Sequence, residues 1–200
     1  MFKSKKRFTK GGVLSPCPEL WAALKSGPGL TEILDDFYTR AFEDELLSSF
    51  FDGVSKKLLV EKVYSFYYQT FTGEDVYFGW RPRNAHHFMV ISDEVMDRRK
   101  ELLEDCLRRY ELPEPWIDRW QSVDEVFRKQ IVKDKPWPRK LGGVELPLEG
   151  YDDVTLTVGS LCDSCDGEIN VGEINVGETA RYHVRTGKTY CRACDPEAKL

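Results

Sequence analysis

The chain has 200 residues, which is enough for one domain and a small additional module. Its net charge of −5 has the wrong sign for a protein that binds the phosphate backbone of nucleic acid, and no apolar run approaches the length of a membrane span. Because the basic N-terminus contains no apolar stretch, we expect no secretory signal and a cytoplasmic location.

Residues 1–14 are predicted to be a basic, flexible arm, and we assign no function to it. Residues 15–134 are predicted to be helical, because their apolar side chains recur at spacings of three and four. Pro18 suits the first turn of a short helix, since its missing N–H would have no partner there. The sequence Gly27–Pro28–Gly29 is expected to end that helix.

Two more helices are predicted before an irregular stretch. The first carries apolar residues over positions 30–42, and a short helical turn covers residues 44–51. The second begins near Ser55, and its apolar stripe runs through residues 59–71. Residues 76–90 contain glycine and proline and show little periodicity, so we expect no regular element there.

Ser92 is placed to cap the next helix, because Asp93 and Glu94 follow it where the helix dipole favours acidic side chains. Arg99 interrupts the apolar stripe of this helix. A buried arginine costs several kcal/mol unless it is paired, so we favour a guanidinium that reaches solvent along its stem. An ion pair with a neighbouring acid is the alternative. A last helix is predicted for residues 116–131.

Residues 135–150 contain prolines and paired glycines and are predicted to be a linker. Beyond it, residues 151–200 contain short runs that alternate apolar and polar side chains, as strands do. The pentapeptide Glu-Ile-Asn-Val-Gly occurs at 168–172 and again at 173–177. We interpret this repeat as a duplicated stretch in a loop or hairpin.

Two Cys-x-x-Cys pairs with 25 residues between them lie in this C-terminal part: Cys162 with Cys165, and Cys191 with Cys194. Four thiolates in this pattern match a tetrahedral Zn²⁺ site, so we interpret residues 151–200 as a zinc ribbon whose folding depends on the metal. An iron–sulfur centre would use the same ligands, and two disulfides are the other alternative, which a reducing cytoplasm disfavours. From residue 150 onward, nine acidic and five basic side chains give a net charge of −4, which disfavours nucleic acid as a partner.

Four stretches of the helical part occur in an order typical of one protein family. They are Asp36-Phe-Tyr-Thr-Arg40, Asp44-Glu-Leu-Leu-Ser-Ser-Phe-Phe51, Gly73-Glu-Asp-Val-Tyr-Phe-Gly79, and Ala85–His86 followed by Ile91–Ser92. Together they resemble the truncated haemoglobins over residues 18–134, and the resemblance implies a shortened two-over-two helical sandwich around haem. The fold expected for the whole chain is mainly α: a truncated globin-like sandwich over residues 15–134, followed by a small β-rich zinc ribbon.

The resemblance also implies haem b as a cofactor, with His86 as the proximal iron ligand. The adjacent His87 is then expected to be a surface residue. Tyr38 matches the family's distal tyrosine, which donates a hydrogen bond to the gas ligand. Many relatives carry glutamine on the distal helix where this chain has leucine and valine, so the distal side should otherwise be apolar, and Lys62 beside it is expected to be solvated. The other expected pocket residues are Phe51, Leu59, Val63, Phe66 and Arg99, the last of which could also pair with a haem propionate.

A haem protein that binds a diatomic gas such as O2 or NO is the function that the resemblance implies. The alternatives are a haem-free globin-like interaction module, and a gas or redox sensor whose zinc ribbon docks a protein partner. Turnover as an NO dioxygenase or peroxidase stays open, and it would need an external reductase because the sequence has no flavin or nicotinamide site. Since a proline-rich linker separates the two parts, we expect the haem spectrum to survive the loss of zinc.

Overall fold

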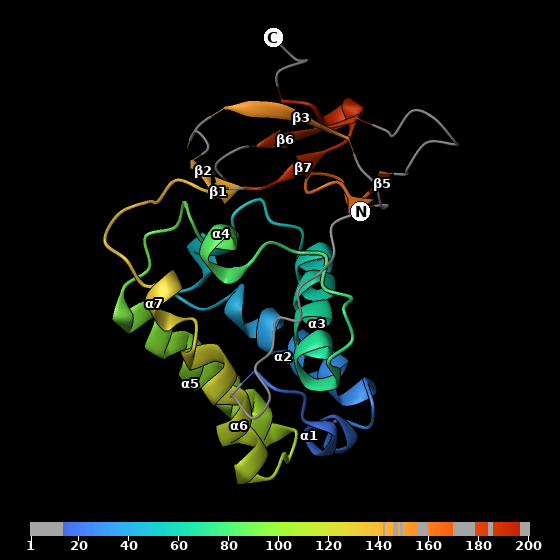
Figure 1. The fold of residues 1–200 in the computed structure, drawn as a ribbon, viewed down its shortest axis with the longest axis vertical. Helices are drawn as coiled ribbons and strands as arrows, with labels where there is room; N and C mark the ends of the chain where they lie inside the picture. The colour runs from blue at the N-terminus through green and yellow to red at the C-terminus, as the bar shows by residue number, and fades with distance from the viewer. Residues whose placement is uncertain are drawn as a thin grey trace.

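The computed structural model describes residues 14–141, 143–145, 148, 150–155, 160–169, 179–183 and 186–196. Almost all of the expected N-terminal arm and most of the pentapeptide repeat lie outside these residues. Helices occupy the described chain up to residue 131, and short strands follow and lie at one end of the helical part (Figure 1). The expected order, helices first and a small strand-rich part second, is confirmed.

The helices are α1 (Pro18–Ala23), α2 (Pro28–Ala41), the 3-10 turn η1 (Ser48–Phe51), α3 (Lys56–Thr72), α4 (Pro82–Ala85), α5 (Asp93–Arg109), α6 (Glu114–Glu125), α7 (Arg128–Ile131) and, in the strand-rich part, the 3-10 turn η2 (Arg192–Cys194).

Serine caps begin the two longest helices. The Ser55 hydroxyl accepts a hydrogen bond from the amide of Leu58 at the start of α3. The Ser92 hydroxyl accepts one from the amide of Val95 at the start of α5, so the predicted cap is confirmed. Helix α3 ends at Gly73, whose φ of 83° is the left-handed conformation that glycine adopts without a steric penalty.

Three helix boundaries differ from the sequence-based expectation. Pro28 does not end a helix but opens α2, because proline fits the first helical turn as well as it breaks an interior one. The predicted helix 116–131 is divided at residues 126–127 into α6 and α7. A single helical turn, α4, lies inside the stretch 76–90 that was expected to be irregular, and it carries His86 at its C-terminal end.

The strands form three small antiparallel sheets: β1 (Lys140–Leu141) with β2 (Val144–Glu145); β3 (Tyr151–Thr155), β6 (Thr179–His183) and β7 (Thr189–Tyr190) in the order β3–β6–β7; and β4 (Ser160–Leu161) with β5 (Glu168–Ile169). The β1–β2 hairpin lies within the segment that was predicted to be only a linker.

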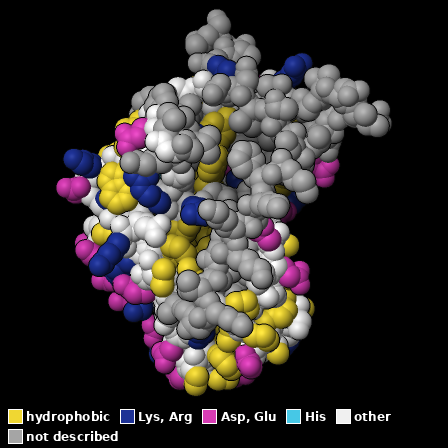
Figure 2. Space-filling model, in the orientation of Figure 1, with side chains coloured by type: hydrophobic (Ala, Val, Ile, Leu, Met, Phe, Trp, Pro, Cys, Tyr) yellow, Lys and Arg dark blue, Asp and Glu magenta, His cyan; other side chains and the backbone are white. Residues whose placement is uncertain are grey.

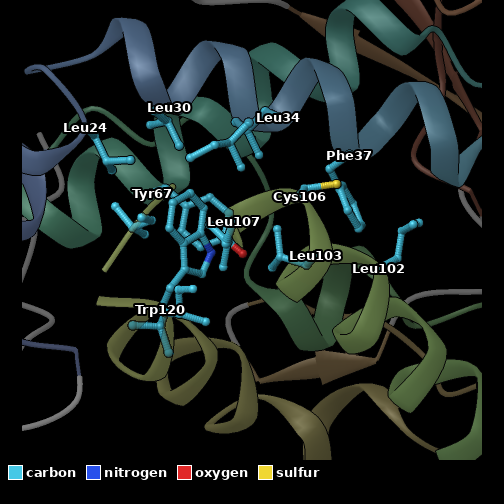
Figure 3. Close-up of a cluster of buried hydrophobic side chains, with 14 of the residues drawn as sticks. Leu24, Leu30, Leu34, Phe37, Tyr67, Leu102, Leu103, Cys106, Leu107 and Trp120 are labelled. Carbon is cyan, nitrogen blue, oxygen red and sulfur yellow. The ribbon is translucent and has the colours of Figure 1, made fainter. Parts of the chain in front are cut away.

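The main core lies between α2, α3, α5 and α6. Helix α2 packs against α3 and α5, and α5 packs against α6. Leu30, Leu34 and Phe37 point from α2 towards α5, as Figure 3 shows. The ring of Trp120 fills the centre and lies 4.7 Å from that of Tyr67. Each such fully buried large apolar side chain contributes roughly 1.5–3 kcal/mol to folding.

The strand-rich part has a much smaller core. Its buried cluster contains Cys162, Ile169 and Ala180 among the residues that the structure describes. The partly buried Cys191 and Cys194 pack against this cluster, so the described core of this part includes three cysteines of the two Cys-x-x-Cys pairs.

Figure 2 shows one face of the molecule, on which hydrophobic side chains form a strip down the middle. Along the left-hand edge of this view, Lys and Arg side chains alternate with Asp and Glu, so this edge carries no continuous basic patch. Among the described residues, no helix is both long and apolar enough to cross a bilayer.

Candidate functional site

A cavity of 540 Å³ brings together all the haem-pocket residues that the sequence suggested. Its volume lies within the roughly 300–1,000 Å³ range of small-molecule sites. The wall includes Tyr38 from α2, Phe51 from η1, Arg99 from α5 and His86 after α4. Helix α3 contributes three further expected residues: Leu59, Val63 and Phe66.

His86 is half-buried on the wall of this cavity. Its Nδ1 lies 2.8 Å from the carbonyl oxygen of Pro82, and because a carbonyl can only accept, Nδ1 carries the proton. The other ring nitrogen, Nε2, therefore holds a lone pair. Burial is the main cause that lowers the pKa of His86, to about 4, so the ring is neutral at pH 7 and suited to bind a metal ion.

His87 is not the surface residue that we expected. Only 1% of it is exposed, and its Nδ1 lies 2.7 Å from the carbonyl oxygen of Asn84. Its Nε2 is enclosed by protein atoms. The two neighbouring histidines therefore differ in how a large ligand could approach them, and His86 is the more accessible of the two.

Tyr38 is 6% exposed and lines the cavity. Its ring makes edge-to-face contacts with Phe37 and Phe51 at centroid distances of 4.9 and 6.1 Å. Burial raises the pKa of Tyr38 to about 12, so the hydroxyl keeps its proton and is a hydrogen-bond donor. The part of the chain that the structure describes provides no hydrogen-bond partner for it.

Arg99 is paired with a neighbouring acid, which was the alternative we did not favour. Its Nη1 donates to Asp124 Oδ2 at 2.8 Å, and the Tyr67 hydroxyl donates to the other oxygen of that carboxylate at 2.6 Å. Burial alone would lower the pKa of Arg99, but Asp124 outweighs burial and raises it. Arg99 also lies over the ring of Phe37. The guanidinium of Arg99 on the cavity wall is thus held in place, and Asp124 neutralises its charge.

The cavity extends beyond the helices, which the sequence did not indicate. Asp163, Tyr182 and Lys188 of the strand-rich part also line it. Asp163 lies near Lys62 of α3, whose pKa is lowered by burial, so Lys62 is not the fully solvated lysine that we expected. Their proximity could not be read from the sequence, because it depends on how the two parts dock.

Direct contacts join the strand-rich part to the segment between η1 and α3. Lys188 Nζ donates to the backbone carbonyl of Asp52 at 2.7 Å. Gly53 follows with a φ of 61°, and a Cβ there would lie 2.8 Å from the same Nζ, so glycine permits this close approach. The Ser55 hydroxyl, which caps α3, also donates to the Asp166 carboxylate.

The start of the expected linker is packed against the loop that carries His86. Lys133 Nζ donates to the carbonyl of His86 at 2.6 Å, and the amide of Trp137 donates to that of His87 at 2.7 Å. Arg83 lies over the Trp137 ring. This segment is therefore not a free spacer, and the two parts of the chain are in contact rather than independent.

The four cysteines of the two Cys-x-x-Cys pairs lie together, and their sulfurs are all within 4.8 Å of one another. Tetrahedral zinc with Zn–S bonds of about 2.3 Å needs sulfurs roughly 3.8 Å apart, so a small contraction would seat the ion. The amides of Ser164 and Cys191 both donate to the Cys162 sulfur at 3.4 Å, as backbone amides do to a thiolate ligand. The donor set fits a thiolate-bound metal.

The residues of the cavity fit a haem. Its wall is mainly apolar and aromatic, it carries an imidazole with an available nitrogen, and it contains a buried arginine, Arg139, that could meet a carboxylate. Helices that enclose such a cavity define a globin-like protein. The model of the family described as "Bacterial-like globin" matches residues 20–132, which is more than half of the chain, and the chain belongs to this family. Family membership implies haem-based binding of a diatomic gas.

Solved structures of truncated haemoglobins share the fold. The truncated haemoglobin of Tetrahymena pyriformis in its Fe(III) form is 20% identical, with 56% of this chain and 97% of that chain covered and a TM-score of 0.54. The 2/2 haemoglobin of Synechococcus sp. PCC 7002, in the cyanomet state with covalently attached haem, is 21% identical with the same coverage and a TM-score of 0.54. No curated protein matches the chain.

Proposed function

We propose that this globin binds one b-type haem in its cavity through His86, and that the haem binds O2 or NO. The observation that carries the proposal is the state of His86, which lines the cavity with Nδ1 bonded to the Pro82 carbonyl. Histidines that ligate metals are usually oriented by such a bond from the second ring nitrogen. The enclosed Nε2 of His87 supports the choice between the two neighbours.

Bound haem supplies the iron at which a diatomic gas is held. The chain contributes the rest of the site. His86 is neutral at pH 7 and presents its Nε2 lone pair. Leu59 and Val63 exclude water from the distal side, and the Tyr38 hydroxyl is a donor for the gas ligand. Asp124 holds Arg99, which keeps that guanidinium from competing for the ligand.

A haem titration of the purified protein tests the proposed function. We expect one haem per chain to bind with a sharp Soret band, and we expect that band to shift when the reduced protein is exposed to CO or O2. The reason is that one apolar cavity offers one suitable imidazole nitrogen. Uptake that does not saturate, or a spectrum that no gas changes, would favour a haem-free interaction module.

Replacing Tyr38 with phenylalanine is expected to speed oxygen release roughly fivefold, because one neutral hydrogen bond contributes about 1 kcal/mol. Flash photolysis or stopped-flow mixing measures the rate. Tyr68→Phe is the matched control, since Tyr68 bonds to Glu74 and does not line the cavity. An unchanged rate in Tyr38→Phe would mean that another donor, such as Lys62, holds the ligand.

We also propose that the four-cysteine cluster binds one structural Zn²⁺ ion. Four thiolates fill a tetrahedral shell and leave no position for a substrate, so the ion would stabilise the fold rather than catalyse. The described core of the strand-rich part supports this proposal, because Cys162 lies in it and Cys191 and Cys194 pack against it.

A sensor is the second candidate function, and one observation favours it. Residues from the strand-rich part line the same cavity as His86. A change in the occupant of the cavity would therefore act on side chains of both parts at once. Such a sensor would also need a partner protein that binds the strand-rich part in one of its two states.

A further inference from the structure

Arg139 is a buried cation for which the described residues provide no anion. It is 4% exposed, and its Nε and Nη1 atoms have no hydrogen-bond partner among the described residues. Burial lowers the pKa of Arg139, and no carboxylate in the described part of the chain offsets that effect. A buried guanidinium is costly unless an acceptor meets it, so the residue needs a partner that the described chain does not supply.

Two aromatic rings fix the position of this guanidinium. Its central carbon lies 4.7 Å from the centroid of the Trp80 ring and 4.7 Å from that of Tyr182. Trp80 precedes α4, and Tyr182 lies on β6, so the contact spans both parts of the chain. Rings over a guanidinium attract its charge but accept no strong hydrogen bond from its N–H groups, whereas a carboxylate can accept two of them.

The cation lies on the wall of the cavity that contains His86. Two arginines of the described chain lie on this wall, and Arg99 is already paired with Asp124. Lys188 donates to the carbonyl of Asp52, and Lys62 lies near Asp163. Arg139 is thus the arginine on the described wall that is left to meet an anionic ligand. The hydroxyl of Tyr182 is also enclosed without a hydrogen-bond partner in the described chain.

We propose that Arg139, whose guanidinium lies over the rings of Trp80 and Tyr182, binds a carboxylate of the haem. The inference rests on the proposed function. The ligand chemistry is that of an amphiphile, with an apolar body for the aromatic cavity and a carboxylate for the buried cation. Arg139 lies outside residues 20–132, so this contact is supplied by the C-terminal extension of the chain and not by its globin segment. Tyr182 makes the strand-rich part a component of the haem site.

The test compares haem b with haem dimethyl ester, whose carboxylates are blocked, in the parent protein and in Arg139→Gln. The rate of haem loss to an excess of apomyoglobin is measured. Arg139→Gln should lose haem b at least roughly tenfold faster than the parent, since hydrogen bonds to charged groups are among the stronger ones. The same substitution should leave the loss of the ester unchanged. In Arg109→Gln, which alters an exposed arginine on α5, both rates should match the parent.

The parent alone gives a second readout that does not depend on the folding of a variant. The parent should lose the ester at least roughly tenfold faster than it loses haem b. This is the same factor that is expected between Arg139→Gln and the parent for haem b. Equal loss of both haems from the parent, or an equal effect of Arg139→Gln on both, would overturn the inference and leave Arg139 a packing residue. Slower loss of the ester when acetate or phosphate is added, seen in the parent but not in Arg139→Gln, would show that Arg139 holds a free anion instead.

The two proposals fail in different ways. A parent protein that binds no haem overturns both of them. A parent that binds one haem through His86, but whose haem loss is unaffected by Arg139→Gln, overturns this inference alone.

Discussion

His86→Gln is expected to abolish the Soret band or to leave a haem that is lost within minutes, whereas His87→Gln keeps a parent-like spectrum. The reason is geometric. His86 lines the cavity with its Nδ1 bonded to the Pro82 carbonyl, and its Nε2 is left as a ligand. Glutamine is preferable to alanine at both positions, because His87 is buried and its removal would leave a cavity. Visible absorption after reconstitution with one equivalent of haem is the measurement.

Rescue by a small ligand separates metal ligation from folding. In His86→Gly, added imidazole should restore the Soret band, because it can occupy the space of the missing side chain. The His87→Gln variant should show the Soret band without added imidazole. If His87→Gln lost the band and His86→Gln kept it, the proximal ligand would be His87, and the loop around α4 would have to open to admit it.

Removal of the metal is expected to have the second large effect. Chelation or Cys165→Ser should unfold the strand-rich part, because its described buried cluster contains Cys162 and packs against Cys191 and Cys194, so the metal would hold this core together. The bond from Lys188 to the Asp52 carbonyl and the Tyr182 ring on Arg139 would be lost with it. We therefore expect haem loss to be roughly fivefold faster or more, since even one hydrogen bond contributes about 1 kcal/mol.

Metal analysis, hydrogen exchange and the rate of haem loss test this prediction together. Cys17→Ser is the matched control, since Cys17 lies at the start of α1 and outside the cluster. Zinc below half an equivalent, with more iron than haem, would favour an iron–sulfur centre. Zinc loss that left the rate of haem loss unchanged would support the independence that the sequence suggested.

Local patterns predicted the helices well. The start of α3 near Ser55 and the serine cap of α5 were readable because a helix start depends on residues within one turn. The four-cysteine cluster was readable because the chemistry of the ion requires those ligands and that spacing. The family resemblance placed Tyr38 and His86 in one cavity, although they are far apart in sequence.

What the sequence did not predict depends on long-range packing. Asp124 is one acid among many along the chain, and only the packing of α6 against α5 pairs it with Arg99. Arg139 lies in a proline-rich stretch that has no periodicity, so it was interpreted as part of a spacer. Its proposed role appears only when Trp80 and Tyr182 are both brought next to its guanidinium.

The position of Tyr182 has a consequence for how the protein is assembled in the cell. The side chain belongs to the sheet beside the cysteine cluster, yet it covers the cation proposed to hold the haem. Under our two proposals, thermodynamic linkage requires that bound metal raise the affinity for haem by the same factor by which bound haem raises the affinity for metal. Cells short of either cofactor would then also load the other less completely, by the same factor.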